Sequence, residues 1–174
     1  LWRKALAYLE RRGNEVGEDL LHHAHLLAGE GHDEDLLQES FGDPLVADVV
    51  LHERGWFERF LKERGPLLPD DEMILATAWA AVPRTVFAVV SAAPGQFMTL
   101  KDRRTGTEVT VPDDRFEDPL HPGVLICGRA VFDGEAHQLM GGLFLVDPSM
   151  ERTVLELCDA RSGEELCAYV AEMR

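Results

Sequence analysis

The sequence has few cysteines, few aromatic residues, few basic residues and no long apolar run. Its 174 residues include 3 Cys and 7% aromatic residues, and 17 Lys and Arg stand against 32 Asp and Glu, a net charge of −15. A general DNA or RNA binder needs a basic surface that displaces counterions, so this balance argues against broad DNA binding and against a polybasic membrane dock. No apolar run approaches the roughly 20 residues of a membrane-spanning helix, so no membrane partner is predicted.

The three cysteines are isolated from one another. Cys127, Cys158 and Cys167 form no CxxC pair, so they provide neither a disulfide framework nor half of a zinc site. Their apolar surroundings indicate small core residues in a reducing compartment, and we expect a cytoplasmic protein. Arg3 and Lys4 interrupt the first apolar residues, so no signal peptide is predicted. Because the first residue is Leu rather than Met, we expect further sequence upstream.

Hydrophobic periodicity changes near residue 83. Apolar residues recur at three and four positions before it, which predicts a helical region over residues 1–82. Residues 83–147 favour five short antiparallel strands in a small, strongly bent, barrel-like sheet, and residues 148–174 favour C-terminal helices. The composition, 45% hydrophobic and 28% charged, is globular. We therefore predict an α+β protein whose three regions pack as one compact body.

Several local signals set the expected ends of these elements. Asp43 followed by Pro44 predicts a helix start, and Ser162 with Glu165 forms the pattern of a capping box. Adjacent glycines at 141 and 142 predict a β-bulge. Three glycines that follow Glu-Arg segments predict helix ends in the left-handed conformation, and these are Gly13, Gly55 and Gly65.

Histidine is concentrated in one expected helix. Glu18, His22 and His25 lie at i, i+4 and i+7, a spacing at which imidazole and carboxylate groups bind zinc or iron. By helix geometry the three lie about 120° from the apolar stripe of the helix, toward solvent. HExxH is absent and no second His-rich segment supplies further ligands, so a solvated face is favoured and a metal site is the alternative.

No segment has the pattern of a known catalytic motif. GxSxG, GxxxxGK[ST] and GxGxxG are all absent. The acidic run at residues 70–72 is typical of a first helical turn. Asp113-Asp114 and Glu117-Asp118 lack the regular spacing of a calcium loop and are interpreted as a solvated loop. These absences favour a non-enzymatic protein.

One short segment departs from the general acidity. Lys101, Arg103 and Arg104 bring three positive charges to an expected hairpin tip. A small antiparallel sheet with a basic tip can contact RNA, whereas most such tips are ordinary solvated turns.

Five segments carry a resemblance to a known family. They are residues 43–48, 60–72, 84–90, 100–106 and 121–129. From about Asp43 onward the sequence resembles the body of bacterial SEC-C motif-containing proteins, and residues 1–5 resemble the helix that follows the zinc motif in those proteins. The family feature is a CxCxxxxxxxxC[HC] zinc knuckle that contacts protein or ribosome. This chain has no CxC, so the resemblance implies no cofactor in this chain. It leaves two alternatives: a zinc knuckle in an upstream segment, or a family member that has lost the knuckle.

These observations together predict a protein-binding module attached to an upstream SEC-C zinc knuckle. The first alternative is a ribosome- or RNA-associated factor that uses Lys101, Arg103 and Arg104. The second is a metal-dependent hydrolase built on Glu18, His22 and His25. A protein partner is the expected one, and no catalytic residue is assigned.

Overall fold

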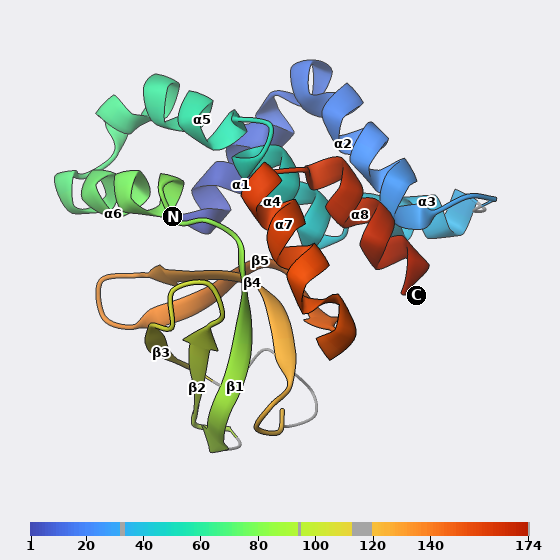
Figure 1. Ribbon diagram of the computed structural model, residues 1–174. Coiled ribbons are helices and arrows are strands. Elements are labelled where there is room, and N and C mark those ends of the chain that lie inside the picture. Colours follow the sequence, from blue (N-terminus) through green and yellow to red (C-terminus); the bar gives the residue numbers. More distant parts are fainter. Residues whose placement is uncertain (32–33, 94, 113–119, 174) are drawn as a thin grey trace. The chain divides into compact units, whose positions relative to one another are not determined.

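Figure 1 shows the protein as a computed structural model that describes residues 1–31, 34–93, 95–112 and 120–173. These residues form eight α-helices, two short 3-10 helices and five strands, which confirms the predicted α+β class. The acidic pairs Asp113-Asp114 and Glu117-Asp118 lie outside the described residues. The chain divides into two compact units, Leu1–Ala81 with Arg161–Arg174, and Val82–Ala160. The last two helices, which the sequence places in one region, belong to different units.

The first unit is entirely helical. It contains α1 (Trp2–Arg11), α2 (Gly13–Ala28), α3 (Glu34–Phe41), α4 (Pro44–His52), α5 (Trp56–Arg64), the 3-10 helix η1 (Gly65–Leu67), α6 (Asp70–Ala80) and α8 (Gly163–Glu172). Helix α2 contacts α3, α4 and α8, and α1 contacts α2 and α5. Among the described helices, none combines the length and the apolar character that a membrane crossing requires. The core of the unit includes Ala5, Leu9, Val16, Ala24, Leu27, Val46, Val49, Phe57, Phe60, Leu166 and Cys167.

The ends of these helices follow the predicted signals only in part. The Asp43 carboxylate accepts a hydrogen bond from the Leu45 backbone N–H at 2.7 Å, with Pro44 in the first turn, as predicted. Ser162 precedes α8 without a side-chain capping bond, so the predicted capping box is wrong. Gly55 is left-handed at a φ of +78°, and it directly precedes α5.

The second unit is built on an antiparallel sheet. Its strands are β1 (Thr85–Ala93), β2 (Phe97–Asp102), β3 (Glu108–Pro112), β4 (Leu125–Phe132) and β5 (His137–Val146), in the order β3-β2-β1-β4-β5. The sheet is open and not a closed barrel, which corrects the barrel-like expectation. Strands β3 and β5 approach within 8 Å between Cα atoms, but along the described strands they share no hydrogen-bonded register. Closure requires the two edge strands to pair, and β3 has 5 residues against 10 in β5.

Strand β5 contains the predicted bulge. Cys127 pairs with Phe144 and Arg129 pairs with Met140, so three residues of β5 lie opposite Gly128 alone. A Cβ atom at Gly128 would lie 2.4 Å from Cδ2 of Leu143. The glycine in β4 therefore gives the bulged strand room to pack against its neighbour.

Two buried arginines of this unit donate to backbone carbonyls, and one of these carbonyls lies in the bulge. Arg84, 1% exposed, donates from Nη1 to the carbonyl oxygen of Gly142 at 2.7 Å. Arg129, 3% exposed, donates from Nη1 to the carbonyl oxygen of Val82 at 2.7 Å. Gly142 is buried and lies outside the regular ladder, so its carbonyl needs another donor, which the Arg84 guanidinium supplies.

One face of the sheet is covered by α7 (Glu151–Ala160), which follows the 3-10 helix η2 (Pro148–Met150) and contacts β1. The Sγ atoms of Cys127 in β4 and Cys158 in α7 lie 3.8 Å apart, and both side chains are buried. Their hydrogen bond and burial raise the pKa of the Cys158 thiol. The three cysteines are free and buried, as expected of core residues.

Candidate functional site

The favoured prediction for the histidine helix is a solvated face, and a metal site on Glu18, His22 and His25 is the alternative. His22 and His25 on α2 line an open cavity of about 660 Å³ against α8, whereas Glu18 does not line it. His22 Nε2 lies 3.5 Å from Glu164 Oε1 on α8, and both side chains are more than half exposed. No group of three metal-binding side chains occurs among the residues that the structure describes. The nearby His23 is buried and donates from Nδ1 to the Asp19 carbonyl at 2.7 Å, and its burial lowers its pKa.

The basic hairpin tip is balanced by carboxylates within the second unit. Arg103 donates from Nε to Glu151 Oε1 at 2.7 Å, and this bond raises the pKa of Arg103. Arg104 Nη2 lies 2.5 Å from Asp159 Oδ1. Lys101 Nζ lies 3.9 Å from Glu108 Oε1, a looser pair. The three positive charges that the sequence places on the tip therefore each face a carboxylate.

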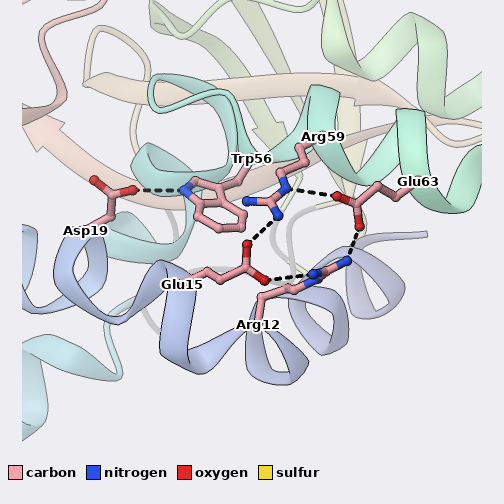
Figure 2. Close-up of polar contacts among 6 residues, drawn as sticks. All are labelled: Arg12, Glu15, Asp19, Trp56, Arg59 and Glu63. Carbon is pink, nitrogen blue, oxygen red and sulfur yellow. Dashed lines mark hydrogen bonds and ion pairs between the residues drawn. The ribbon is translucent and has the colours of Figure 1, made fainter.

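A closed ring of charges joins α2 and α5 to the residue between α1 and α2, all in the first unit (Figure 2). Arg12 contacts Glu15 at 2.7 Å and also Glu63, and Arg59 contacts Glu63 at 2.9 Å and also Glu15. Each arginine thus bonds both glutamates, and each glutamate bonds both arginines. The ring has no net charge, and it fixes α5 against the junction of α1 and α2.

The ring continues into an aromatic and acidic contact, which Figure 2 also shows. The Arg59 guanidinium lies 4.7 Å from the ring centroid of Trp56, a cation–π contact. Trp56 Nε1 donates to Asp19 Oδ2 at 2.9 Å, and Arg54 Nε donates to Asp19 Oδ1 at 3.0 Å. The arrangement satisfies the charges within the protein, so we interpret it as structural.

The charge ring predicts a specific pH dependence. Arg12 lowers the pKa of Glu15 and Arg59 lowers that of Glu63, so both lie below the ordinary value of 4.5. As the pH falls, these two glutamates are therefore protonated in the unfolded state before they are protonated in the folded state. The stability that the ring contributes is fully present above pH 4.5 and is lost as the pH falls through the folded-state pKa values. We expect Arg59→Gln to lower the urea midpoint at about pH 7, and to have a smaller effect at about pH 3. A pH-independent difference between Arg59→Gln and the parent protein would contradict this explanation.

Helix α1 also borders an apolar groove of about 520 Å³. It runs between α1, α2 and the junction of α3 and α4, and all of these elements belong to the first unit. The apolar groove is lined by Trp2, Leu6, Leu9, Glu10, Gly13, Gly17, Leu20, Phe41, Gly42, Pro44 and Ala47.

Two glycines and a partly exposed phenylalanine leave open space along the apolar groove. A Cβ atom at Gly13 or at Gly17 would meet no other atom within 4 Å. Phe41 is 43% exposed, although it is a large apolar residue. Glycines one helical turn apart leave a shallow channel along α2, so a partner backbone can approach this helix closely.

Sequence reasoning did not find this groove. Trp2, Ala5, Leu6 and Leu9 have the spacing of one apolar helix stripe, but only Ala5 and Leu9 of these four are buried. Trp2 and Leu6 are partly exposed and line the groove. The available signal was the pair Gly13 and Gly17, four residues apart in the first turns of α2, of which only Gly13 was interpreted, as a helix end.

Comparison with known proteins identifies no relative from which a function of these surfaces could be inferred. Neither the family models nor the curated proteins give a match to the chain. The resemblance to SEC-C motif-containing proteins therefore stays a prediction.

Proposed function

We propose that this protein is a non-enzymatic cytoplasmic protein-binding module, and that its apolar groove binds an amphipathic helix of a partner protein. The observation that carries the proposal is the apolar groove itself, which leaves large apolar side chains partly exposed beside two glycines. Recognition of this kind places apolar side chains at i, i+3 or i+4 and i+7 of the partner helix into the groove.

Charge defines the expected partner further. The first unit contains 10 Lys and Arg against 20 Asp and Glu, a net charge of −10. Among the described residues that line the apolar groove, the one charged residue is Glu10, which is acidic. Complementary charge accelerates association and suppresses wrong partners, so the partner helix is expected to have basic residues beside its apolar face.

The other two functions have less support from the side chains. The hairpin tip has carboxylate partners for Lys101, Arg103 and Arg104, so an RNA backbone would have to compete with them. The histidines on α2 face an open cavity with one glutamate 3.5 Å away.

The test fills the apolar groove without harming the fold. Gly17→Leu places a large side chain where open space exists, and Leu is a better helix former than Gly, so the variant is expected to fold. The probe is a synthetic helix of about 18 residues with Leu on one face and Lys on the other, measured by calorimetry. We expect saturable binding that Gly17→Leu weakens at least about tenfold.

Two controls separate groove binding from general attraction. Asn14→Leu introduces the same side chain on the exposed part of α2, outside the groove lining, and is expected to keep the parent affinity. A matched peptide with Glu in place of Lys is expected to bind more weakly. Equal weakening by both Leu variants, or self-association of the protein that Gly17→Leu abolishes, would contradict the proposed occupant.

A further inference from the structure

A second pocket lies on another flank of α1, between α1, α5 and η1. It has a volume of about 250 Å³. Its charged lining residues are Lys4, Arg11 and Arg64, and its apolar lining includes Tyr8, Phe60 and Leu67. We call it the cationic pocket. It shares no lining residue with the apolar groove, so it is independent of the proposed function.

The charge of this pocket is opposite to that of its surroundings. Every charged residue that lines it is basic, although the unit that contains it has a net charge of −10. Lys4 pairs with Glu72. Arg11 and Arg64 have no carboxylate partner among the described residues, whereas Arg12, Arg54 and Arg59 in the same unit are each ion-paired.

A structural role in the helices accounts for only part of this charge. Arg11 lies in the last turn of α1 and Arg64 in the last turn of α5, where each faces the negative end of a helix dipole. That end is equivalent to about half an elementary charge. Two full positive charges against two half charges leave about one positive charge at the pocket.

The apolar walls of the cationic pocket indicate that a ligand would have an apolar part beside its negative charge. The rings of Tyr8 and Phe60 meet edge to face with centroids 5.6 Å apart, and Leu67 is 72% exposed at the margin. Ligand pockets for drug-sized molecules span about 300–1,000 Å³, so 250 Å³ suits a smaller apolar body, such as one ring or a short chain.

We propose that the cationic pocket binds a small organic oxyanion, with its carboxylate or phosphate against Arg11 and Arg64 and its apolar body against Tyr8, Phe60 and Leu67. Guanidinium groups bind both oxyanions through paired hydrogen bonds, so the two share one recognition chemistry. Extended polyanions are disfavoured, because the net charge of −15 repels them beyond the pocket.

The test uses benzoate, phenyl phosphate and inorganic phosphate as probes, each titrated into isotope-labelled protein by NMR. We expect saturable shifts at Arg11, Arg64 and Tyr8 with benzoate or phenyl phosphate, and the tighter of the two identifies the source of the anion. Arg11→Gln with Arg64→Gln is expected to weaken binding at least about tenfold. The matched control, Arg3→Gln with Lys62→Gln, removes the same charge from the same two helices outside the pocket lining and is expected to keep the affinity.

Three results would overturn the proposal. They are the absence of saturable shifts with both aromatic probes, equal weakening by the control pair, and inorganic phosphate binding as tightly as phenyl phosphate. Leu67→Ser changes an exposed wall residue and supplies a second measurement, with weaker binding of phenyl phosphate expected and binding of inorganic phosphate unchanged. Gly17→Leu is expected to leave all three titrations unchanged, so failure here and failure of the apolar groove are separate outcomes.

Discussion

Arg84→Ala is expected to lower the free energy of unfolding of the sheet unit by about 3 kcal/mol. Arg84 is 1% exposed, and its Nη1 donates to the carbonyl of Gly142 at 2.7 Å. The substitution leaves a buried carbonyl without this donor, which costs about 1–3 kcal/mol, and it also leaves a cavity where the long side chain packed.

Urea unfolding followed by far-UV circular dichroism measures this effect, and hydrogen exchange of the β4 and β5 amides localises it. The control is Arg152→Ala, in the same unit, because Arg152 has a 90% exposed side chain and a loose pair with Glu156 at 3.6 Å. Its substitution is expected to change stability by less than about 0.5 kcal/mol. Arg84→Lys keeps the charge but loses the planar donor geometry, so an intermediate value is expected. Similar losses for Arg84→Ala and Arg152→Ala would contradict this role of Arg84.

The bulge that Arg84 supports shows what local sequence can predict. Adjacent glycines at 141 and 142 predicted it, because glycine is the residue that accepts the backbone of a bulge, and Gly141 has a φ of +73°. The arginine that bonds the bulge lies 58 residues away in sequence. Nothing in a window around Arg84 distinguishes it from an exposed cation, because its burial is decided by tertiary contacts.

The three glycines after Glu-Arg segments show the same limit. Gly55 is left-handed as predicted, with a φ of +78°. Gly13 instead begins α2 directly after Arg12, which has a φ of −100°. Gly65 continues into the 3-10 helix η1 with a φ of −50°. The sequence identified where the helices end but not how the chain leaves each one, since this depends on where the next helix packs.

The fold could be predicted from the sequence better than the candidate sites could, because the sites depend on tertiary contacts. Periodicity predicted the helices and strands, because it reports which side of an element is apolar. The hairpin tip is basic in sequence, yet Glu151 and Asp159 of α7 bring carboxylates to Arg103 and Arg104. The apolar groove and the cationic pocket each combine side chains from helices far apart in sequence. Apart from the glycines at 13 and 17, these surfaces leave no local pattern in the sequence.

The contact between α4 and α8 leads to the second large expected effect. A Cβ atom at Gly163 would lie 2.3 Å from Val49 Cγ1 and 3.4 Å from Val49 Cβ. Val49 is fully buried and β-branched, so in a helix it has one strongly preferred rotamer and cannot swing aside. We expect Gly163→Ala to destabilise the helical unit by about 1–3 kcal/mol. The measurement is urea unfolding followed by tryptophan fluorescence, because all three Trp residues lie in this unit.

The same substitution at Gly17 provides the control with the opposite sign. A Cβ atom there meets nothing within 4 Å, so Gly17→Ala is expected to stabilise the protein by about 0.5–1 kcal/mol through helix propensity alone. Combining Gly163→Ala with Val49→Ala removes the methyl group that causes the clash, so the double variant is expected to be more stable than the sum of the single effects implies. If the two substitutions are additive within about 0.5 kcal/mol, Val49 is not the obstacle, and the close packing of α8 on α4 does not depend on glycine at this position.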